Sequence, residues 1–517
     1  MIRSSFDQKA FESFDISTLS NQLKEAEDIT FIPPSSKEAT VAIKGSSVFG
    51  LDIVPALWGD IIAELKDGCN VEFFAATGHG KTTLGKIAAL NFDEGSCLVI
   101  TPSIALARTQ IADLVARGVT AALWGHSMFT FSNLPKFVYI TPEAVCHGWA
   151  RLLPLYKQFS LLMIDELSLI YSNKHFRRAF KVLGALRAAL GVPCYLCSIH
   201  ISRKKLAYIE RVLNFKNPQK LKRHEQGPVL RHNAIISFNQ YPSKQILRSE
   251  GLLPFIKCHK HNAGIVYVRT RKEVETVASY LNKNLPGVKV LKYHAKMKDE
   301  ERQAVEIAFM TGLSILVSTS ACAYGINNSF ISWVAFYGLP YNLIDFQQMA
   351  GRAGREKGTL AFIWCGYTNW EEEAFRRKSA RVYRSKKQAF YQTEYEELLN
   401  IVHEATCRRV AITRAIKGKS VKPCGVCDIC RADHKAAKVR FLLEKLRKKI
   451  AIATKTPPQL VFSEGLLDTL AGIPQADGIQ RGRPQTIEEL ISIKGLGPAK
   501  VARYGELILE LTNNHAL

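Results

Sequence analysis

The amino-acid sequence predicts an α/β protein in which two parallel β-sheets follow one another along the chain, with helical modules after them. Short apolar or β-branched runs alternate with helical patterns from about residue 46 to 228 and again from about 229 to 365, which is typical of βαβ units. After these, residues 366–406 have a helical, charged pattern, four cysteines cluster, and the last stretch has no convincing strand. Two such sheets in tandem would leave a cleft between them.

The length of the chain allows several domains. It has 517 residues, whereas a single hydrophobic core stops growing at roughly 250–300 residues. We therefore divide it into an N-terminal extension without a functional interpretation, two α/β lobes, a helical cysteine-bearing segment and a helical C-terminal unit. Their predicted bounds are 1–45, 46–228, 229–365, 366–435 and 436–517.

Composition and charge narrow the class of protein. The chain is 47% hydrophobic and 22% charged, as soluble globular proteins are. It shows neither a membrane-spanning apolar stretch nor a secretory signal in residues 1–5. We therefore expect a cytoplasmic protein, nucleoid-associated in a bacterium or nuclear in a eukaryote, with no membrane partner.

The net charge of +24 predicts a polyanionic partner. A solvated basic surface that only aids solubility would give the same charge. The basic residues are spread over many segments, which disfavours a single membrane-surface helix.

Residues 75–83 predict a phosphate-binding loop. They follow a strand-like run and precede a helical pattern, so backbone N–H groups at the helix N-terminus would wrap phosphates. Lys81 would reach the β- and γ-phosphates of ATP, and Thr82 would place its hydroxyl on Mg²⁺. A chance Gly-Lys-Thr turn is the alternative, because Ala75 stands where the common pattern has its first glycine. The other predicted nucleotide-binding residues of the loop are Thr77, Gly78 and Gly80.

Asp165 and Glu166 are the second part of the predicted nucleotide site. They follow the apolar run 161–164, and ligand chemistry in open parallel sheets gathers at the carboxyl ends of strands. Asp165 would hold Mg²⁺ through water, and Glu166 would orient and deprotonate the attacking water. A lone Asp-Glu pair is usually a solvated helix start, but its position after a phosphate-binding loop favours the catalytic interpretation.

Residues 348–355 are the third part and belong to the second predicted lobe. Arg352 and Arg355 are three residues apart and share a helical face. Guanidinium groups suit the charge that grows on a transferring phosphoryl group, so these arginines and Gln348 are candidate catalytic residues. One ATP site would then draw on both sheets. On this motor hypothesis, ATP closes the lobes and hydrolysis opens them.

Together these motifs resemble the core of superfamily 2 helicases, and the second lobe narrows the resemblance to the RecQ family. Residues 263–271, 293–295 and 318–327 resemble that family's motifs IV to V, and residues 100–106 and 139–143 resemble motif Ia and the motif after it. The resemblance covers about 46–517. It implies two RecA-like lobes and an ATP-dependent DNA helicase or translocase with 3′-to-5′ polarity. It further implies ATP and Mg²⁺ as ligands, single-stranded and branched or tailed duplex DNA as partners, and a role in DNA repair or recombination.

The sequence departs from the RecQ pattern at four places. The adenine-reading glutamine is missing from residues 54–58, and Ser168 replaces the histidine that couples hydrolysis to DNA. The aromatic-rich loop is reduced to residues 173–177, and the threonine-rich motif III reads Leu-Cys-Ser-Ile-His at 196–200. These changes concern coupling more than phosphate chemistry. We therefore expect ATP hydrolysis and leave open the adenine preference and the extent of unwinding.

The cysteines fall into two groups. Cys407, Cys424, Cys427 and Cys430 have the spacing C-x₁₆-C-x₂-C-x₂-C, which suits a closed tetrahedral Zn²⁺ site that stabilises the fold. Disulfides are disfavoured in a cytosolic chain, and an iron–sulfur cluster is a further alternative. The residues around Cys407 and Cys424 also resemble the RecQ zinc subdomain. The remaining cysteines are scattered among mostly apolar neighbours and are predicted to be buried thiols.

The C-terminal unit predicts a further module. The gap between Cys430 and the next helical pattern is too short for the family's winged helix, which we expect to be absent. Residues 457–463, 486–490 and 493–500 resemble the HRDC domain, the helicase-and-RNaseD C-terminal fold. The turn at Gly495 and Gly497, with Lys494 and Lys500 beside it, would contact a phosphate. A structural turn with solvated lysines is an equal alternative.

Two other functions stay open from the residues alone. An RNA helicase of the same superfamily is one, although the zinc and C-terminal modules disfavour it. A nucleotide-gated DNA-binding protein with a weak or uncoupled ATPase is the other. The altered coupling motifs keep it open, whereas the intact Lys81, Glu166 and Arg355 weigh against it. The sequence indicates no particular protein partner.

Overall fold

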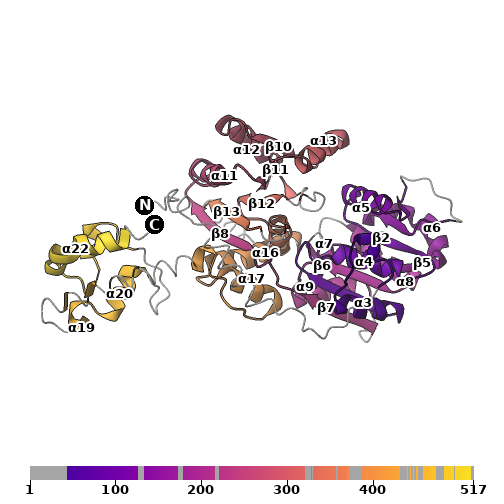
Figure 1. Cartoon of the computed structure of the whole chain (residues 1–517), viewed down its shortest axis with the longest axis horizontal. Helices are drawn as coiled ribbons and strands as arrows, with labels where there is room; N and C mark the ends of the chain where they lie inside the picture. Colours follow the sequence, from indigo (N-terminus) through magenta and orange to yellow (C-terminus); the bar gives the residue numbers. More distant parts are fainter. Residues whose placement is uncertain are drawn as a thin grey trace. The chain divides into compact units, whose positions relative to one another are not determined.

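The computed structural model describes two compact units of the chain (Figure 1). The larger unit contains the described residues up to Glu404 and Arg409–Val421, and the smaller contains Ala405–Arg408 and the described residues from Lys422 onward. Across the described ranges, every helix is too short or too polar to span a bilayer. The described residues are 43–125, 133–172, 178–215, 220–320, 328, 330–356, 359–368, 371, 386–430, 439, 443, 446–447, 450–451, 458–472, 483–493 and 495–513.

The first sheet of the larger unit has seven parallel strands. Successive side chains of a strand point to opposite faces, so Phe73 and Val99 enter one apolar cluster while Phe74 and Leu98 enter the other. Apolar residues on both faces explain the nearly continuous apolar runs in the sequence. The strand order is β3 (Ala121–Leu123), β4 (Phe137–Ile140), β2 (Ser96–Ile100), β5 (Phe159–Ile164), β6 (Cys194–Ser198), β1 (Asn70–Ala75) and β7 (Leu221–Gln226).

Helices cover both faces of this sheet. Buried residues of α3, α4 and α5 join one apolar cluster, and buried residues of α6, α7, α8 and α9 join the other. The helices are α3 (Ala56–Lys66), α4 (Lys81–Leu90), α5 (Ile104–Ala116), α6 (Pro142–Leu152), α7 (Ser168–Ser172), α8 (Leu183–Leu190) and α9 (Arg203–Val212), with short 3₁₀ turns η1 (Ser47–Phe49), η2 (Leu153–Gln158) and η3 (Arg178–Val182).

The second sheet has six parallel strands and also two apolar faces. Ile265 and Val334 enter one cluster, while Val266 and Trp333 enter the other. The strand order is β10 (Lys289–Tyr293), β11 (Ser314–Ser318), β9 (Ala263–Val268), β12 (Ile331–Tyr337), β13 (Ala361–Thr368) and β8 (Ala234–Tyr241). The helices that follow are α10 (Lys244–Ile246), the π-helical η5 (Leu247–Leu252), α11 (Leu253–His259), α12 (Arg271–Asn284), α13 (Asp299–Met310), α14 (Leu343–Ala350), α16 (Lys386–His403) and α17 (Arg408–Lys417).

Side-chain caps fix where several helices begin. The Thr270 hydroxyl accepts from the Glu273 backbone N–H at 3.2 Å, and the Glu273 carboxylate accepts from the Thr270 N–H at 3.0 Å. This reciprocal capping box starts α12 at the carboxyl end of β9. Asn342 caps α14 in the same manner, by accepting from the Asp345 N–H at 2.8 Å. Both helices therefore start where the sequence motifs place functional residues.

The described C-terminal part of the smaller unit is helical. Buried apolar residues such as Phe462, Leu467, Leu490 and Ile508 form its core. The Thr486 hydroxyl caps α21 by accepting from the Glu489 N–H at 3.3 Å. The helices are α19 (Pro458–Val461), α20 (Glu464–Ala471), α21 (Ile487–Ile491) and α22 (Pro498–Asn513).

The predicted architecture is confirmed. The short apolar runs of the two predicted lobes form parallel strands of two sheets, and a helical C-terminal region follows them. The finer division of the chain into five segments stays a prediction. Residues 1–42 and the shortened loop at 173–177 lie outside the described residues, as do Ala321 to Asn327 of the motif V stretch.

Candidate nucleotide site and cysteine cluster

The predicted phosphate-binding loop joins strand β1 to helix α4. Gly78 and Gly80 have φ angles of 82° and 71°, a left-handed conformation that disfavours other residues. A Cβ on Gly80 would also lie only 2.9 Å from the Trp58 ring. The Lys81 ammonium donates to the carbonyl oxygens of Ala75 at 2.9 Å and Ala76 at 2.8 Å. Burial lowers the pKa of Lys81 and the Glu166 charge opposes that effect, so this lysine is a partly desolvated cation within the loop.

Asp165 lies beside the start of α4 and gathers several donors. Its carboxylate accepts from the Thr82 hydroxyl at 3.2 Å and from the Gln110 amide at 3.1 Å. The Cys197 thiol donates to it at 3.2 Å from the end of β6. A hydroxyl and a carboxylate in contact are the oxygen ligands that Mg²⁺ prefers. Thr82 and Asp165 therefore fit a magnesium site.

Glu166 contacts the second lobe directly. The Gln348 amide of α14 donates to the Glu166 carboxylate at 2.6 Å. Burial and the neighbouring Asp165 raise the pKa of Glu166, while Lys81 and Arg352 oppose that rise. Glu166 also has a positive φ of 56°, which is uncommon for a residue with a side chain. The two predicted halves of the site therefore meet at this carboxylate.

Three arginines approach one another at this site. Burial, followed by the charges of Arg352 and Arg231, lowers the pKa of Arg355. Burial and Arg352 likewise lower the pKa of Arg231. Burial outweighs the opposing charge of Glu166 at Arg355, and a bound anion would further favour the charged guanidinium groups. The arrangement thus favours a multiply charged anionic ligand beside Lys81.

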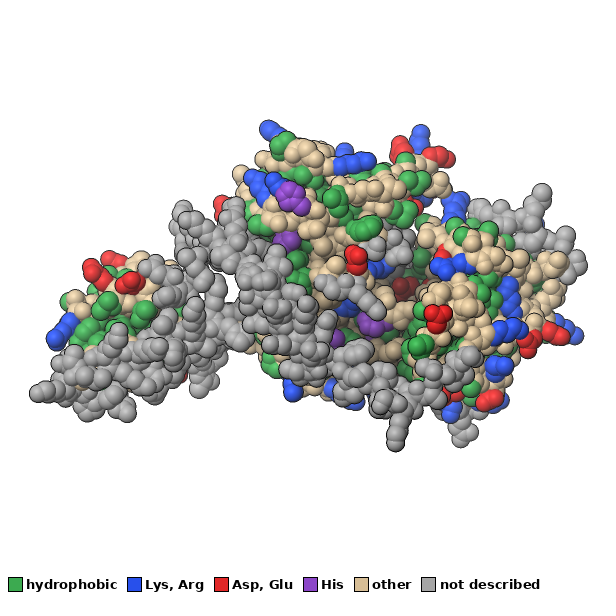
Figure 2. Space-filling model, in the orientation of Figure 1, with side chains coloured by type: hydrophobic (Ala, Val, Ile, Leu, Met, Phe, Trp, Pro, Cys, Tyr) green, Lys and Arg blue, Asp and Glu red, His purple; other side chains and the backbone are tan. Residues whose placement is uncertain are grey.

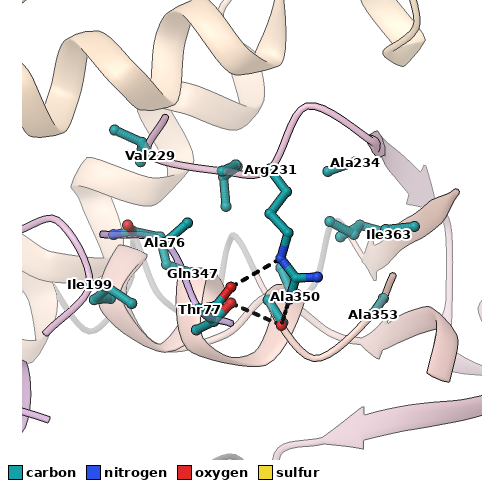
Figure 3. A pocket seen from close by; sticks show the side chains of 13 residues that line it. Ala76, Thr77, Ile199, Val229, Arg231, Ala234, Gln347, Ala350, Ala353 and Ile363 are labelled. Carbon is teal, nitrogen blue, oxygen red and sulfur yellow. Dashed lines mark hydrogen bonds between the residues drawn. The ribbon is translucent and has the colours of Figure 1, made fainter. Parts of the chain in front are cut away.

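Arg231 is a further candidate site residue, which no sequence motif predicted. Its guanidinium donates to the carbonyl oxygens of Thr77 at 3.1 Å and Gly351 at 2.7 Å (Figure 3). The Thr77 hydroxyl donates to the same Gly351 carbonyl at 2.9 Å. Arg231 thus ties the phosphate-binding loop to the end of α14. A single arginine before β8 has no local pattern that would single it out.

Arg409 of α17 supports the segment that carries Arg231. Its guanidinium donates to the carbonyl oxygens of Leu230 at 3.0 Å, Arg231 at 2.9 Å, His232 at 3.0 Å and Ala234 at 3.2 Å. Four bonds from one buried guanidinium hold this backbone in a fixed shape. Arg231 is therefore presented on a braced segment.

Replacing Arg231 by alanine should lower the rate of ATP turnover by about tenfold or more, because small misplacements of catalytic groups have large rate effects. The change removes the tie that aligns Arg352 and Arg355 with the loop. Steady-state ATPase assays would measure the effect, with the exposed Arg211→Ala as the matched control. Unchanged turnover in Arg231→Ala would contradict this role.

Ser168 lies at the start of α7, where the sequence departs from the family pattern. It is fully buried, and its backbone N–H donates to the Ser198 hydroxyl at 3.0 Å. The contact between this segment and the end of β6 therefore uses the Ser168 backbone. Side-chain identity at position 168 is not needed for this bond.

The four clustered cysteines come together within the smaller unit. Their sulfur atoms all lie within 4.8 Å of one another, and the Cys407 and Cys427 sulfurs are 4.0 Å apart. A disulfide has its sulfurs at about 2.05 Å, whereas tetrahedral Zn–S bonds of about 2.3 Å place sulfurs about 3.8 Å apart. Hydrogen bonding to Cys407 and Cys424 raises the pKa of Cys427. The thiolate form is therefore unfavourable here unless a cation is bound between the sulfur atoms. The geometry fits zinc.

Arg408 braces the cysteine cluster. Its guanidinium donates to both carboxylate oxygens of Asp428, from Nε at 2.9 Å and 3.2 Å and from a terminal nitrogen at 3.0 Å. Asp428 also accepts from the Ile429 N–H at 2.9 Å. Such bidentate pairs fix geometry as well as add energy. Arg408 and Asp428 therefore hold the loop that carries three of the four thiols.

At the glycine turn of the C-terminal unit, Lys500 makes contacts within the protein. Gly495 has a φ of 99°. The Lys500 ammonium donates to the carbonyl oxygens of Leu460 at 3.2 Å and Val461 at 2.8 Å. Lys494 lies outside the described residues. For Lys500 these bonds favour the interpretation as a structural turn.

Three family models match the chain. They are the DEAD/DEAH box helicase at residues 59–201, the helicase conserved C-terminal domain at 245–357 and the HRDC domain at 437–512. The first two models each match one of the two α/β lobes, and the third matches the helical C-terminal unit. The order of the three agrees with the predicted order of modules.

Known proteins are similar to this chain over most of its length. It is 28% identical to the ATP-dependent DNA helicase RecQ of Haemophilus influenzae, over 74% of this chain and 62% of that protein. It is 28% identical to that of Pasteurella multocida, over 81% of this chain and 66% of that protein. The chain thus spans less than two thirds of these relatives. In fold it is similar to the DUF1998 helicase MrfA bound to DNA, with a TM-score of 0.52 and 17% identity, over 71% of this chain and 53% of that one.

The comparisons agree with the geometry of the described residues. Two parallel-sheet lobes, an HRDC match and a buried four-cysteine cluster occur in one chain. The resemblance inferred from the sequence is thereby confirmed. The matches and the cysteine cluster together support a superfamily 2 helicase of the RecQ type.

Proposed function

We propose that the chain is an ATP-dependent DNA helicase or translocase of the RecQ type. The observation that carries the proposal is the 2.6 Å bond from Gln348 of the second lobe to Glu166 of the first. One hydrolytic site built from two lobes makes the reaction depend on their arrangement. The RecQ relatives are named as ATP-dependent DNA helicases, which supports DNA as the polymer. Polarity of 3′-to-5′ and a role in repair or recombination are parts of the proposal.

Each site residue has a role in the proposed reaction. Lys81 and the backbone of Thr77, Gly78 and Gly80 bind the phosphates, and Thr82 with Asp165 holds Mg²⁺. The magnesium ion neutralises charge on the phosphate oxygens when bound. Glu166 orients the attacking water and accepts its proton.

The second lobe contributes charge stabilisation. Arg352 and Arg355 neutralise negative charge that develops on the phosphoryl group. Gln348 orients Glu166 through their hydrogen bond. The crowded arginines, whose pKa values burial lowers, support this role because a phosphate would relieve their mutual repulsion. Each contribution requires the lobes to be closed.

We assign the four-cysteine cluster to zinc, in a structural role. The mutual distances of up to 4.8 Å and the burial of three of the four cysteines support a closed site without an open coordination position. Cys407, Cys424, Cys427 and Cys430 would hold the ion as thiolates. The Arg408–Asp428 pair would orient the loop around it.

A basic groove on the second lobe supports nucleic-acid binding. It lies at the carboxyl ends of β9 and β10 and is lined by Thr270, Arg271, Lys272, Glu275, His294 and Lys296. Cationic side chains and a helix N-terminus suit phosphate groups. On the face that Figure 2 shows, Lys and Arg side chains are scattered among acidic ones, so no single basic band dominates that face. We therefore place part of the DNA contact at this groove.

Replacing Arg271 and Lys296 together by alanine should weaken binding of single-stranded DNA. Each lost phosphate contact reduces the slope of affinity against salt by about one. Fluorescence anisotropy with a labelled oligonucleotide, measured across a salt series, would give both quantities. A double variant at two distant exposed sites, Lys66→Ala with Arg211→Ala, is the control. Equal affinities and slopes in both double variants would contradict the assignment of this groove.

Unwinding itself is tested with tailed duplexes. A duplex with a 3′ single-stranded tail should be separated in the presence of ATP and Mg²⁺, and one with a 5′ tail should not. Separation of neither substrate would contradict unwinding as the activity of the chain. Separation of the 5′-tailed substrate alone would contradict the proposed polarity.

A further inference from the structure

Helix α16 is built into the apolar cores of both lobes of the larger unit. Tyr395 and Leu398 belong to the core cluster of the second sheet. Phe390, earlier in the same helix, belongs to the core cluster of the first sheet, and Tyr391 packs against that cluster. One helix therefore shares side chains with two lobes whose relative arrangement sets the ATP site. A change in that arrangement must act on α16.

A buried polar cluster joins α16 to the first lobe. The Lys205 ammonium of α9 donates to the carboxylates of Glu394 and Glu397, at 2.6 Å in each case. The side chains of Lys205 and Glu394 are only 8% and 5% exposed. The Tyr171 hydroxyl of α7 donates to the second oxygen of Glu394 at 3.1 Å. Removing water from such charges is costly, so the cluster holds only while its geometry is complete.

Aromatic contacts fix the same junction. The rings of Tyr171 and Phe390 meet edge to face with centroids 5.3 Å apart, a favourable arrangement for aromatic pairs. The Lys205 ammonium also lies 5.6 Å from the centre of the Tyr171 ring. Burial and the Glu394 charge raise the pKa of Tyr171, so its hydroxyl stays a donor. Two residues of α16, Phe390 and Glu394, therefore contact Tyr171.

Tyr171 is only one helical turn from the predicted catalytic carboxylate. Helix α7 starts at Ser168, and the Leu169 N–H donates to the Glu166 carbonyl at 3.0 Å. A displacement of Tyr171 would move this turn and hence the Glu166 backbone. Gln348 holds the carboxylate of the same residue from α14. Glu166 is thus connected to the second lobe in two ways. Its carboxylate bonds to Gln348, and its backbone is linked through α7 and Tyr171 to α16.

We propose that Tyr171, Lys205 and Glu394 form a positioning cluster that places Glu166 according to the arrangement of the lobes. The inference rests on the proposed ATP hydrolysis. The residues touch no reacting atom, so they act through the backbone of α7. Two carboxylates share one ammonium, so loss of Lys205 would leave both carboxylates without a cation between them. The junction is consequently either formed or broken, as a two-state element requires.

Hydrogen exchange of the full chain tests the connection without any catalytic readout. The variant Glu394→Gln keeps the size of the side chain and removes its charge. We expect the amides of α7 to exchange about tenfold faster in this variant, because the charged bonds from Tyr171 and Lys205 to Glu394 become weaker neutral ones. Mass spectrometry of peptides covering residues 164–172 would measure it. Faster exchange in α16 alone, with α7 unchanged, would overturn the proposal.

Kinetics separate positioning from simple stabilisation. Lys205→Met should lower kcat for ATP about tenfold with little change in KM, since the misplaced group acts in the chemical step. Lys204→Met, an exposed neighbour on α9, is the matched control and should retain kcat. Tyr171→Phe and Glu394→Gln should show non-additive effects on kcat when combined. A lower melting temperature with unchanged kcat would mean that the cluster only stabilises the fold.

The two hypotheses fail in different ways. Absence of ATP turnover in the unmodified chain would contradict the proposed function. The exchange of α7 in Glu394→Gln decides the positioning cluster independently of turnover.

Discussion

Replacing Glu166 by glutamine should reduce ATP turnover by about 100- to 10,000-fold, which is the range typical of general acid–base catalysis. Glutamine has nearly the same shape but cannot accept the proton of the attacking water. The Gln348 amide lies 2.6 Å from this carboxylate, and it would still find an acceptor in the new side chain. ATP binding should therefore persist while hydrolysis is lost.

Two measurements on the same protein separate these effects. Calorimetric titration with ATP and Mg²⁺ reports binding, and phosphate release reports turnover. Glu300→Gln, a change of an exposed glutamate on α13, is the matched control and should behave as the parent chain. Retention of more than half of the turnover in Glu166→Gln would remove Glu166 as the base.

Replacing Cys427 by serine should abolish zinc binding and unfold the segment that the cysteine cluster holds. Structural zinc sites have apparent binding free energies of about 10–16 kcal/mol near neutral pH. Cys427 is fully buried, and its sulfur is 4.0 Å from that of Cys407. Water therefore cannot reach a serine hydroxyl at this position to solvate it. The loss of one thiolate should remove most of this energy.

Elemental analysis and thermal unfolding would measure the two consequences. The parent chain should contain one zinc per molecule, and Cys427→Ser should contain almost none and melt earlier. Cys146→Ser, which changes an exposed cysteine outside the cluster, should keep the zinc. Iron in place of zinc in the parent chain would identify an iron–sulfur cluster instead. Full zinc content in Cys427→Ser would contradict the assignment of its thiolate as a ligand.

The parts of the fold that depend on local patterns were predictable from the sequence. Buried parallel strands such as β2 and β5 are continuous apolar runs, because helices cover both faces of the sheet. Strand β7, whose sequence is Leu-Lys-Arg-His-Glu-Gln, was not predicted. Among the described strands it lies at the edge of the sheet and pairs with β1 alone. A polar edge strand forms because it pairs with its neighbour, and its sequence has no alternation of apolar residues from which it could be predicted.

The candidate site was predictable where its residues stand in short strings. Lys81, Asp165 and Arg355 are each part of such a string, and the cysteine spacing marks the four-cysteine cluster. Arg231 was not predictable, because its partners Thr77 and Gly351 are 154 and 120 residues away in the chain. The junction of Tyr171 with Glu394 spans 223 residues. Contacts of this kind follow from the packing of two lobes, which no local pattern records.

The central claim is that ATP hydrolysis in this chain is coupled to DNA, and ATPase assays with and without single-stranded DNA test it most directly. Lys81→Ala is the control, because it removes the ammonium that lies within the phosphate-binding loop. We predict strong stimulation by DNA in the parent chain and loss of turnover in the control. A low rate that is indifferent to DNA would contradict the claim and favour a nucleotide-gated DNA-binding protein.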